Sequence, residues 1–299
     1  MVHVQCMDPR TNENYNFLYC PSFPAAVLFS ALFGLSLIVH LIQAVYYRKR
    51  FCWVVIMGAA WETGGFVLRV LSVLHTTSGA YGVPSQLLIL LSPLWINAFL
   101  YVVMARLIYL FVPEKRLLGI RAQRLSVIFV LLDIIAFLVQ AGGGSLINPD
   151  NSAKLMLIGI HVYMGGIGFQ QFFVLLFTGL VVRYHFRMQE IDESNDQGWK
   201  RSLYTIYACI VLITIRIIFR LIEFSSGLFS PITMTEAPFY TTEALPMFLA
   251  LLLLNASHPA LVLVGPDSEF PRKEKKSKEE KQRRRSDLEK LNQSSSPLQ

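Results

Sequence analysis

Ionisable side chains recur inside the long apolar stretches of this sequence. Glu62 and Arg69 share one stretch, Asp133 lies in another, and four more ionisable residues lie in the last two. If these stretches cross a membrane, each such group costs at least ~2.5 kcal/mol by insertion scales, so it usually faces a bundle interior or a water-filled cavity. The chemistry indicated is the binding of a charged or polar group inside a membrane domain.

The polar residues are spaced so that they share helical faces. Residues three, four or seven positions apart lie on one side of a helix. This spacing relates Glu62 to Arg69, Asp133 to Gln140, and Arg216 to Arg220 and Glu223. Each of three predicted helices therefore presents a polar stripe, which we expect to face inward.

Counting from the nearest loops assigns these residues a depth. The candidate substrate-binding residues, at or next to the midplane, are Glu62, Asp133, Asn97, Gln140 and Gln170. A charged network is predicted in the outer half, made of Arg69, Arg216, Arg220, Glu223, Glu236, Tyr240 and Glu243. Together they predict a polar cavity open to the outside, with carboxylates at its floor.

A purely structural role is the alternative, because the acids and arginines could pair with one another. For Arg220 and Glu223 on one helix, structural pairing is favoured. For Glu62 and Asp133 a functional role is favoured, because no basic residue is predicted at their depth.

The elements that position these side chains follow from composition. The chain has 299 residues, of which 54% are hydrophobic and 16% charged, against about 25% charged in ordinary globular domains. The high hydrophobic and low charged fractions exclude a disordered chain. Four cysteines are too few for a disulfide scaffold of this length. The seven apolar stretches, each reaching the roughly 20 residues that span a membrane, are Ser22–Tyr46, Cys52–Val73, Pro84–Phe111, Ala122–Gln140, Leu155–Val182, Ser202–Glu223 and Phe239–Val264. We therefore expect an all-α, seven-transmembrane bundle, with a kink in the third span at its prolines.

The basic residues predict its orientation. Of the 27 Lys and Arg residues, 21 follow the first, third, fifth or seventh span. The positive-inside rule then places the N-terminus outside and the C-terminus in the cytoplasm, and explains the net charge of +7 without a nucleic-acid partner. The predicted domains are an extracellular segment (1–21), the membrane domain (22–264) and a disordered, charged cytoplasmic tail (265–299).

Two further features of the predicted loops and tail have open interpretations. Cys6 and Cys20 fall on the predicted outer side, where they can pair or remain free. In the tail, Ser286 follows three arginines and is a possible phosphorylation site that would reverse contact with anionic lipid. A plain solvated tail is the alternative.

The motifs of several other protein classes are missing from the sequence. The span histidines are too scattered in depth to gather on one metal ion, so no metal, cofactor or catalytic residue is predicted. No phosphate-binding loop occurs, which argues against ATP hydrolysis by that route, and the predicted spans contain no lysine for a retinal Schiff base. The G-protein-coupled receptor motifs are also missing, with Ala105-Arg106-Leu107 at the end of the third span.

At these positions the sequence resembles the fungal lipid-translocating exporter family, from about Tyr19 to Pro259. The first matching pieces are Tyr19-x-Pro21-Ser22, Glu62-x-x-Gly65-Phe66-x-x-Arg69, Asn97-Ala98-x-x-Tyr101, Asp133-x6-Gln140-x-Gly142-Gly143-Gly144 and Gly159-x5-Gly165-x4-Gln170. The most specific block is Arg216-x-x-x-Arg220-x-x-Glu223-x-x-x-Gly227, followed by Glu236-x-x-x-Tyr240, Pro246-Met247 and His258-Pro259. Phe66, Glu243 and Ala260 depart from the family's usual residues but keep their general chemistry.

The resemblance implies a non-enzymatic membrane protein that moves amphipathic lipids or lipophilic toxins, in the plasma membrane or an internal one. In this hypothesis, Glu62 and Asp133 hold a cationic head, such as that of a sphingoid base or a sterol-like amine. The outer arginines then repel the cation outward, and transport is facilitative or proton-coupled. A lipid- or sterol-binding sensor in a stress response is the alternative, and a membrane scaffold whose charges are structural is a third.

Overall fold

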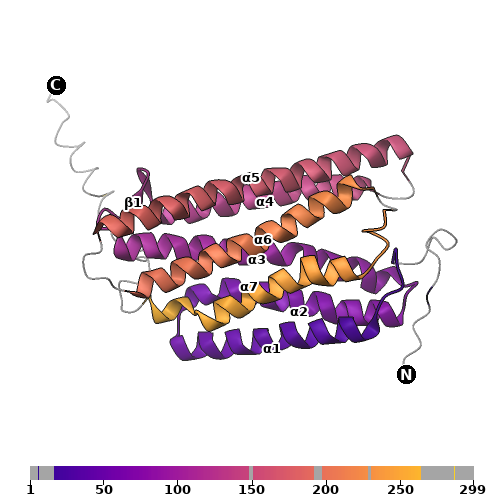
Figure 1. Ribbon diagram of the computed structural model, residues 1–299, viewed down its shortest axis with the longest axis horizontal. Coiled ribbons are helices and arrows are strands. Elements are labelled where there is room, and N and C mark those ends of the chain that lie inside the picture. Colours follow the sequence, from indigo (N-terminus) through magenta and orange to yellow (C-terminus); the bar gives the residue numbers. More distant parts are fainter. Residues whose placement is uncertain are drawn as a thin grey trace. The chain divides into compact units, whose positions relative to one another are not determined.

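A computed structural model of the chain describes residues 6, 17–147, 151–191, 197–227, 230–263 and 286. It contains seven helices that are long and apolar enough to cross a membrane (Figure 1). Their bounds are α1 Phe23–Tyr47, α2 Trp53–Leu74, α3 Gly79–Phe111, α4 Ala122–Leu146, α5 Ala153–Ile191, α6 Gln197–Ser225 and α7 Leu245–Ala256. Short elements complete the bundle: η1 Arg50–Cys52, β1 Arg116–Leu117, β2 Ile120–Arg121, η2 Phe239–Ala244 and η3 Pro259–Leu261. The predicted seven-helix membrane domain is confirmed.

Local sequence explains where the first helix begins. The Ser22 hydroxyl accepts a hydrogen bond from the backbone N–H of Ala25, and Pro24 occupies the first turn, where its missing N–H costs nothing. Along α1 only a quarter or so of the most apolar window is buried, whereas more than half of the corresponding window of α3 is buried. The helix α1 therefore lies at the periphery of the bundle and α3 at its centre.

Each helix packs against its neighbours in chain order, and α7 returns to α1. The central helix α3 contacts α2 and α4 and also reaches α5 and α6. Its inward face carries a dense group of fully buried residues, among them Ile89, Ile96, Phe99, Met104 and Leu107. Because α3 is central, inward-facing side chains of α2, α4 and α6 lie next to it.

Several helices differ from the predicted spans, among them α6, which starts five residues before Ser202, and the seventh span, which is divided into η2, α7 and η3. The helix α3 starts at Gly79 and runs through Pro84 and Pro93, which lie inside it. Pro84 is the sixth residue of α3, and Pro93 lies deeper still, so each removes an N–H that would otherwise donate to the carbonyl four residues earlier. The helix α5 continues nine residues past Val182, and α4 continues six past Gln140, through the glycines that end the predicted span.

Glycines explain the close packing of α4 on α5. A Cβ atom added to Gly159 would lie 2.8 Å from the carbonyl oxygen of Gly143, and one added to Gly166 would lie 2.9 Å from the backbone nitrogen of Gln140. A Cβ on Gly143 would overlap the backbone of Tyr163. Backbone-to-backbone contact of this kind is the means by which small residues bring membrane helices together.

The neighbouring glycines of α4 test this packing. Gly143→Ala should destabilise the protein by about 1–3 kcal/mol, because the new methyl group meets rigid backbone. Gly142→Ala is the matched control: a Cβ there meets nothing within 4 Å, and alanine is the better helix former. Thermal unfolding in detergent should show a lower Tm for the first variant only; equal Tm values would contradict this account of the interface.

Candidate functional site

A buried ion-pair network joins α6 to the first part of the seventh span. Glu243 Oε1 lies 3.0 Å from Arg216 Nη2 and 2.8 Å from Arg220 Nη2. Arg220 Nη1 also contacts Glu223 Oε2, at 3.1 Å, which confirms the predicted pairing within α6. The side chain of Glu243 is 1% exposed, so one carboxylate holds two guanidinium groups away from water.

The helical geometry of both elements makes this network possible. Arg216 and Arg220 are one turn apart on α6 and so point the same way. Opposite them, the seventh span opens with the π-helical segment η2, which buries both Tyr240 and Glu243 against the bundle. Such wide turns are rare and frequently occur at functional sites.

A second network ties the chain before α1 to α2 and η2. Arg69 Nη2 donates to Tyr19 OH at 2.7 Å and lies 3.3 Å from Glu236 Oε1, and Arg69 Nε donates to Tyr240 OH at 3.2 Å. The guanidinium also sits 4.0 Å from the ring centre of Phe239. Burial raises the pKa of Tyr19 above its ordinary value, although Arg69 opposes that shift.

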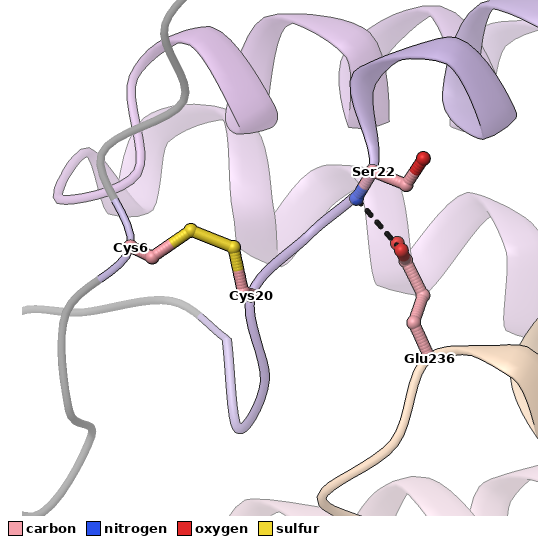
Figure 2. The surroundings of a disulfide bond; sticks show 4 residues. All are labelled: Cys6, Cys20, Ser22 and Glu236. Carbon is pink, nitrogen blue, oxygen red and sulfur yellow. Dashed lines mark hydrogen bonds between the residues drawn. A yellow bond between two sulfur atoms is a disulfide. The ribbon is translucent and has the colours of Figure 1, made fainter.

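Glu236 is the junction of this second network. Its other carboxylate oxygen accepts a hydrogen bond of 2.7 Å from the backbone N–H of Ser22, the residue that caps α1 (Figure 2). Two residues earlier, Cys20 is joined to Cys6 in a disulfide (Figure 2). The pairing that the sequence left open is therefore present, and it lies two residues before the cap of α1.

The outer networks balance their charges. Three arginines, Arg69, Arg216 and Arg220, face three glutamates, Glu223, Glu236 and Glu243. This neutrality gives no support to the expected outward repulsion of a cation by the arginines. Their observed role is to hold α2, α6 and the seventh span together.

Glu62 lies inward of these networks and is 1% exposed. Arg216 and Ser92 are close enough to act on it electrostatically. However, Arg216 donates to Glu243, and the Ser92 hydroxyl donates to the carbonyl oxygen of Gly58 at 2.8 Å. Neither carboxylate oxygen of Glu62 accepts a hydrogen bond. Burying a polar group without a hydrogen-bond partner costs free energy. A ligand or a proton that binds Glu62 would remove that cost.

Asp133 is the second buried acid of the bundle. Its Oδ2 atom accepts hydrogen bonds from Asn97 Nδ2 at 3.1 Å and from Tyr101 OH at 2.9 Å, both on α3. Its Oδ1 atom has no partner. Tyr101 was not among the predicted site residues, although its position four residues after Asn97 places both on one face of α3.

The two glutamines form a separate pair between α4 and α5. Gln140 Nε2 donates to Gln170 Oε1 at 3.0 Å. The five candidate substrate-binding residues thus divide into three groups: Glu62, Asp133 with Asn97, and Gln140 with Gln170. The polar stripes do face inward, because Glu62, Arg69, Asp133, Gln140, Arg216 and Arg220 are all buried.

A polar cleft of about 290 Å³ lies at the end of the bundle where α1 begins. Its lining residues include Arg69, Glu223, Ser72, Ser85 and Gln86, together with Tyr19 of the segment before α1. The expected carboxylate floor is not part of this cleft: neither Glu62 nor Asp133 lines it. Arg69 and Tyr19 of the second network line the cleft, whereas Glu62 lies two helical turns from Arg69 along α2.

Among the described residues, no three His, Cys, Asp or Glu side chains are grouped so that they could hold a metal ion. Ser286 is exposed, and the rest of the predicted tail lies outside the described residues.

The RTA1-like protein family model matches residues 55–265, which includes α2 to the end of the seventh span. The chain belongs to the RTA1-like family. No solved structure matches this chain.

Named relatives of the chain occur in several fungi. A protein of Emericella nidulans named "Probable lipid transporter atnI" is 44% identical over 87% of this chain and 72% of its own length. The Saccharomyces cerevisiae "Protein RTA1" is 27% identical over 82% of this chain and 85% of its own length. The "Sphingoid long-chain base transporter RSB1" of the same species is 22% identical over 86% of this chain and 78% of its own length. The resemblance inferred from the motifs is confirmed.

The pairing at Glu243 makes a stability prediction. Glu243→Gln should destabilise the protein by about 3–5 kcal/mol, because it leaves Arg216 buried without an acid. Glu223→Gln is the matched control; its side chain is 21% exposed, and Arg220 keeps Glu243. Melting curves in detergent should separate the two variants clearly, and similar losses would show that Glu243 is not the central acceptor.

Proposed function

We propose that this RTA1-like protein moves amphipathic lipids with a cationic head, such as sphingoid long-chain bases or sterol-like amines, across a fungal plasma membrane. The observation that carries the proposal is Glu62, a carboxylate enclosed by the helices whose two oxygens have no partner. The names of the relatives, which include lipid and sphingoid-base transporters, support the same substrate class.

The charge arrangement explains why a cation suits Glu62. The three outer arginines are already matched by three glutamates, so a basic group entering near Glu62 meets an unmatched acid rather than a net positive field. A single-chain amine needs only its head in the protein, because its tail is stable in the surrounding lipid. Asp133, with its free Oδ1 atom, supplies a second acceptor on the α3–α4 side.

In this proposal the segment before α1 controls the outer exit. Tyr19 and Ser22 hold Arg69 and Glu236 across the top of the helices, next to the polar cleft. Opening this contact joins the cleft to the buried acids and releases the head outward. No ATP-hydrolysis motif occurs in the sequence, so movement is facilitative or coupled to protons carried by Glu62 or Asp133.

The test is transbilayer movement of a fluorescent long-chain base in proteoliposomes. Glu62→Gln should reduce the protein-dependent rate by about tenfold or more, the value of one lost charged interaction. Asp133→Asn should reduce it less, because an amide oxygen can still accept from Tyr101. Glu190→Gln, an acid-to-amide change at an exposed ion pair of α5, is the matched control and should transport normally.

Transport by Glu62→Gln at the wild-type rate would overturn the assigned role of this residue. Absence of protein-dependent movement with the unmodified chain would overturn transport itself and favour the sensor hypothesis, for which ligand binding is the next measurement. Imposing a pH gradient across the same vesicles distinguishes proton-coupled from facilitative movement.

A further inference from the structure

A small β-hairpin separates α3 from α4, at the end of the bundle opposite the disulfide (Figure 1). Its strands β1 and β2 are two residues long and antiparallel, and Arg116 lies directly opposite Arg121. The two turn residues, Leu118 and Gly119, both have positive φ values, 51° and 76°, as a tight two-residue hairpin requires. Leucine rarely adopts this conformation, so the turn holds a large apolar side chain at an unusual position.

The hairpin concentrates positive charge that the protein does not neutralise. Like charges directly opposite each other destabilise a strand pair. The nearest acid in the chain, Glu114, is engaged elsewhere: its Oε1 atom lies 3.0 Å from Arg187 Nη2 of α5. The pKa of Glu114 is below its ordinary value, first through a hydrogen bond with its own backbone and then through Arg187. Within the described part of the chain, Arg116, Arg121 and Arg124 have no acidic partner.

Two hollows flank the paired arginines, and both are lined by Arg116 and Arg121. One, of about 420 Å³, adds Arg124 and Ile128 of α4. The other, of about 260 Å³, adds Lys115, the ring of Tyr109, over which the Lys115 ammonium sits at 4.3 Å, and Glu114, whose carboxylate is paired with Arg187. Two guanidinium groups that converge on a hollow match the geometry of a phosphate group.

The apolar residues beside these arginines indicate that the phosphate belongs to a lipid. Leu118 at the turn is 67% exposed, Ile120 is 40% exposed and Ile128 is 43% exposed. Arg124 and Ile128 are one turn apart on α4, so a basic group and a lipid-facing apolar group share one helical face. A soluble phosphate would use the arginines alone, whereas a membrane lipid also uses the apolar residues.

We propose that the α3–α4 hairpin is a binding site for the phosphate-bearing headgroup of an anionic membrane lipid. Arg116 and Arg121 hold the phosphate, Arg124 adds charge at the membrane surface, and Leu118, Ile120 and Ile128 contact the lipid's glycerol and chain region. This site is separate from the buried acids and does not depend on the transport proposal. The positive-inside rule places it on the cytoplasmic side, where anionic lipids concentrate.

The test measures binding of dioctanoyl phosphatidylinositol 4-phosphate to the purified full-length chain in a neutral detergent, by native mass spectrometry and fluorescence titration. Arg116→Gln with Arg121→Gln should weaken binding about 25-fold, at about fivefold for each charge near the surface. The control is the double variant Arg50→Gln with Arg183→Gln, which also removes two positive charges from exposed positions outside the hairpin. It should weaken lipid binding less than threefold.

Two further arms distinguish the sources of the phosphate. Leu118→Ser with Ile120→Ser should weaken the short-chain lipid but leave binding of soluble inositol 1,4-bisphosphate unchanged. Equal losses in the hairpin and control arginine variants would overturn the site, because they would indicate only general attraction to positive charge. Soluble headgroup binding as tight as the lipid would overturn the lipid assignment, and equal binding of dioctanoyl phosphatidylcholine would overturn the requirement for an anion. An unchanged Tm in each variant confirms that the fold is intact.

Discussion

The structure of this protein depends on a single carboxylate, Glu243, which accepts two buried arginines. Without it, α6 would carry two positive charges into the middle of a membrane bundle, at a cost that hydrophobic packing does not readily offset. With it, α6 and the seventh span are joined by ion pairs whose side chains are at most 7% exposed. The π-helical segment η2 buries Tyr240 and Glu243 together, so the two polar networks meet on one short element.

The pairing of Glu243 with Arg216 and Arg220 also determines which buried acids have no basic partner. Once Glu223, Glu236 and Glu243 are assigned to the three arginines, the acids of the described helices that have no ion pair are Glu62 and Asp133. An excess of acid in a protein interior is stable only if a proton or a ligand completes it. The proposed function rests on this excess, because a cationic head would supply the missing partner.

The two ends of the bundle differ in whether their arginines are paired with acids. At the disulfide end, every described arginine has an acid, and the chain before α1 covers the contact. At the hairpin end, Arg116 faces Arg121 and the neighbouring acid is taken by α5. Neutral pairing suits a passage that an amphipathic cation must cross, and unpaired basic groups suit attachment to an anionic surface. The two proposals accordingly concern opposite ends of the bundle and different charge arrangements.

The sequence alone determined the seven helices, because each needs only about 20 apolar residues and depends on no distant partner. It also determined that the stripes containing Glu62, Asp133 and Arg216 face inward, because helical periodicity fixes faces. Motifs placed on successive spans were enough to recognise the family. Only the tertiary structure decided which acid pairs with which arginine, because partners such as Arg216 and Glu243 lie on different helices whose relative rotation no local pattern fixes. For the same reason it was the fold that separated Gln140 and Gln170 from Asp133, added Tyr101 to that acid, and left Glu62 unpartnered.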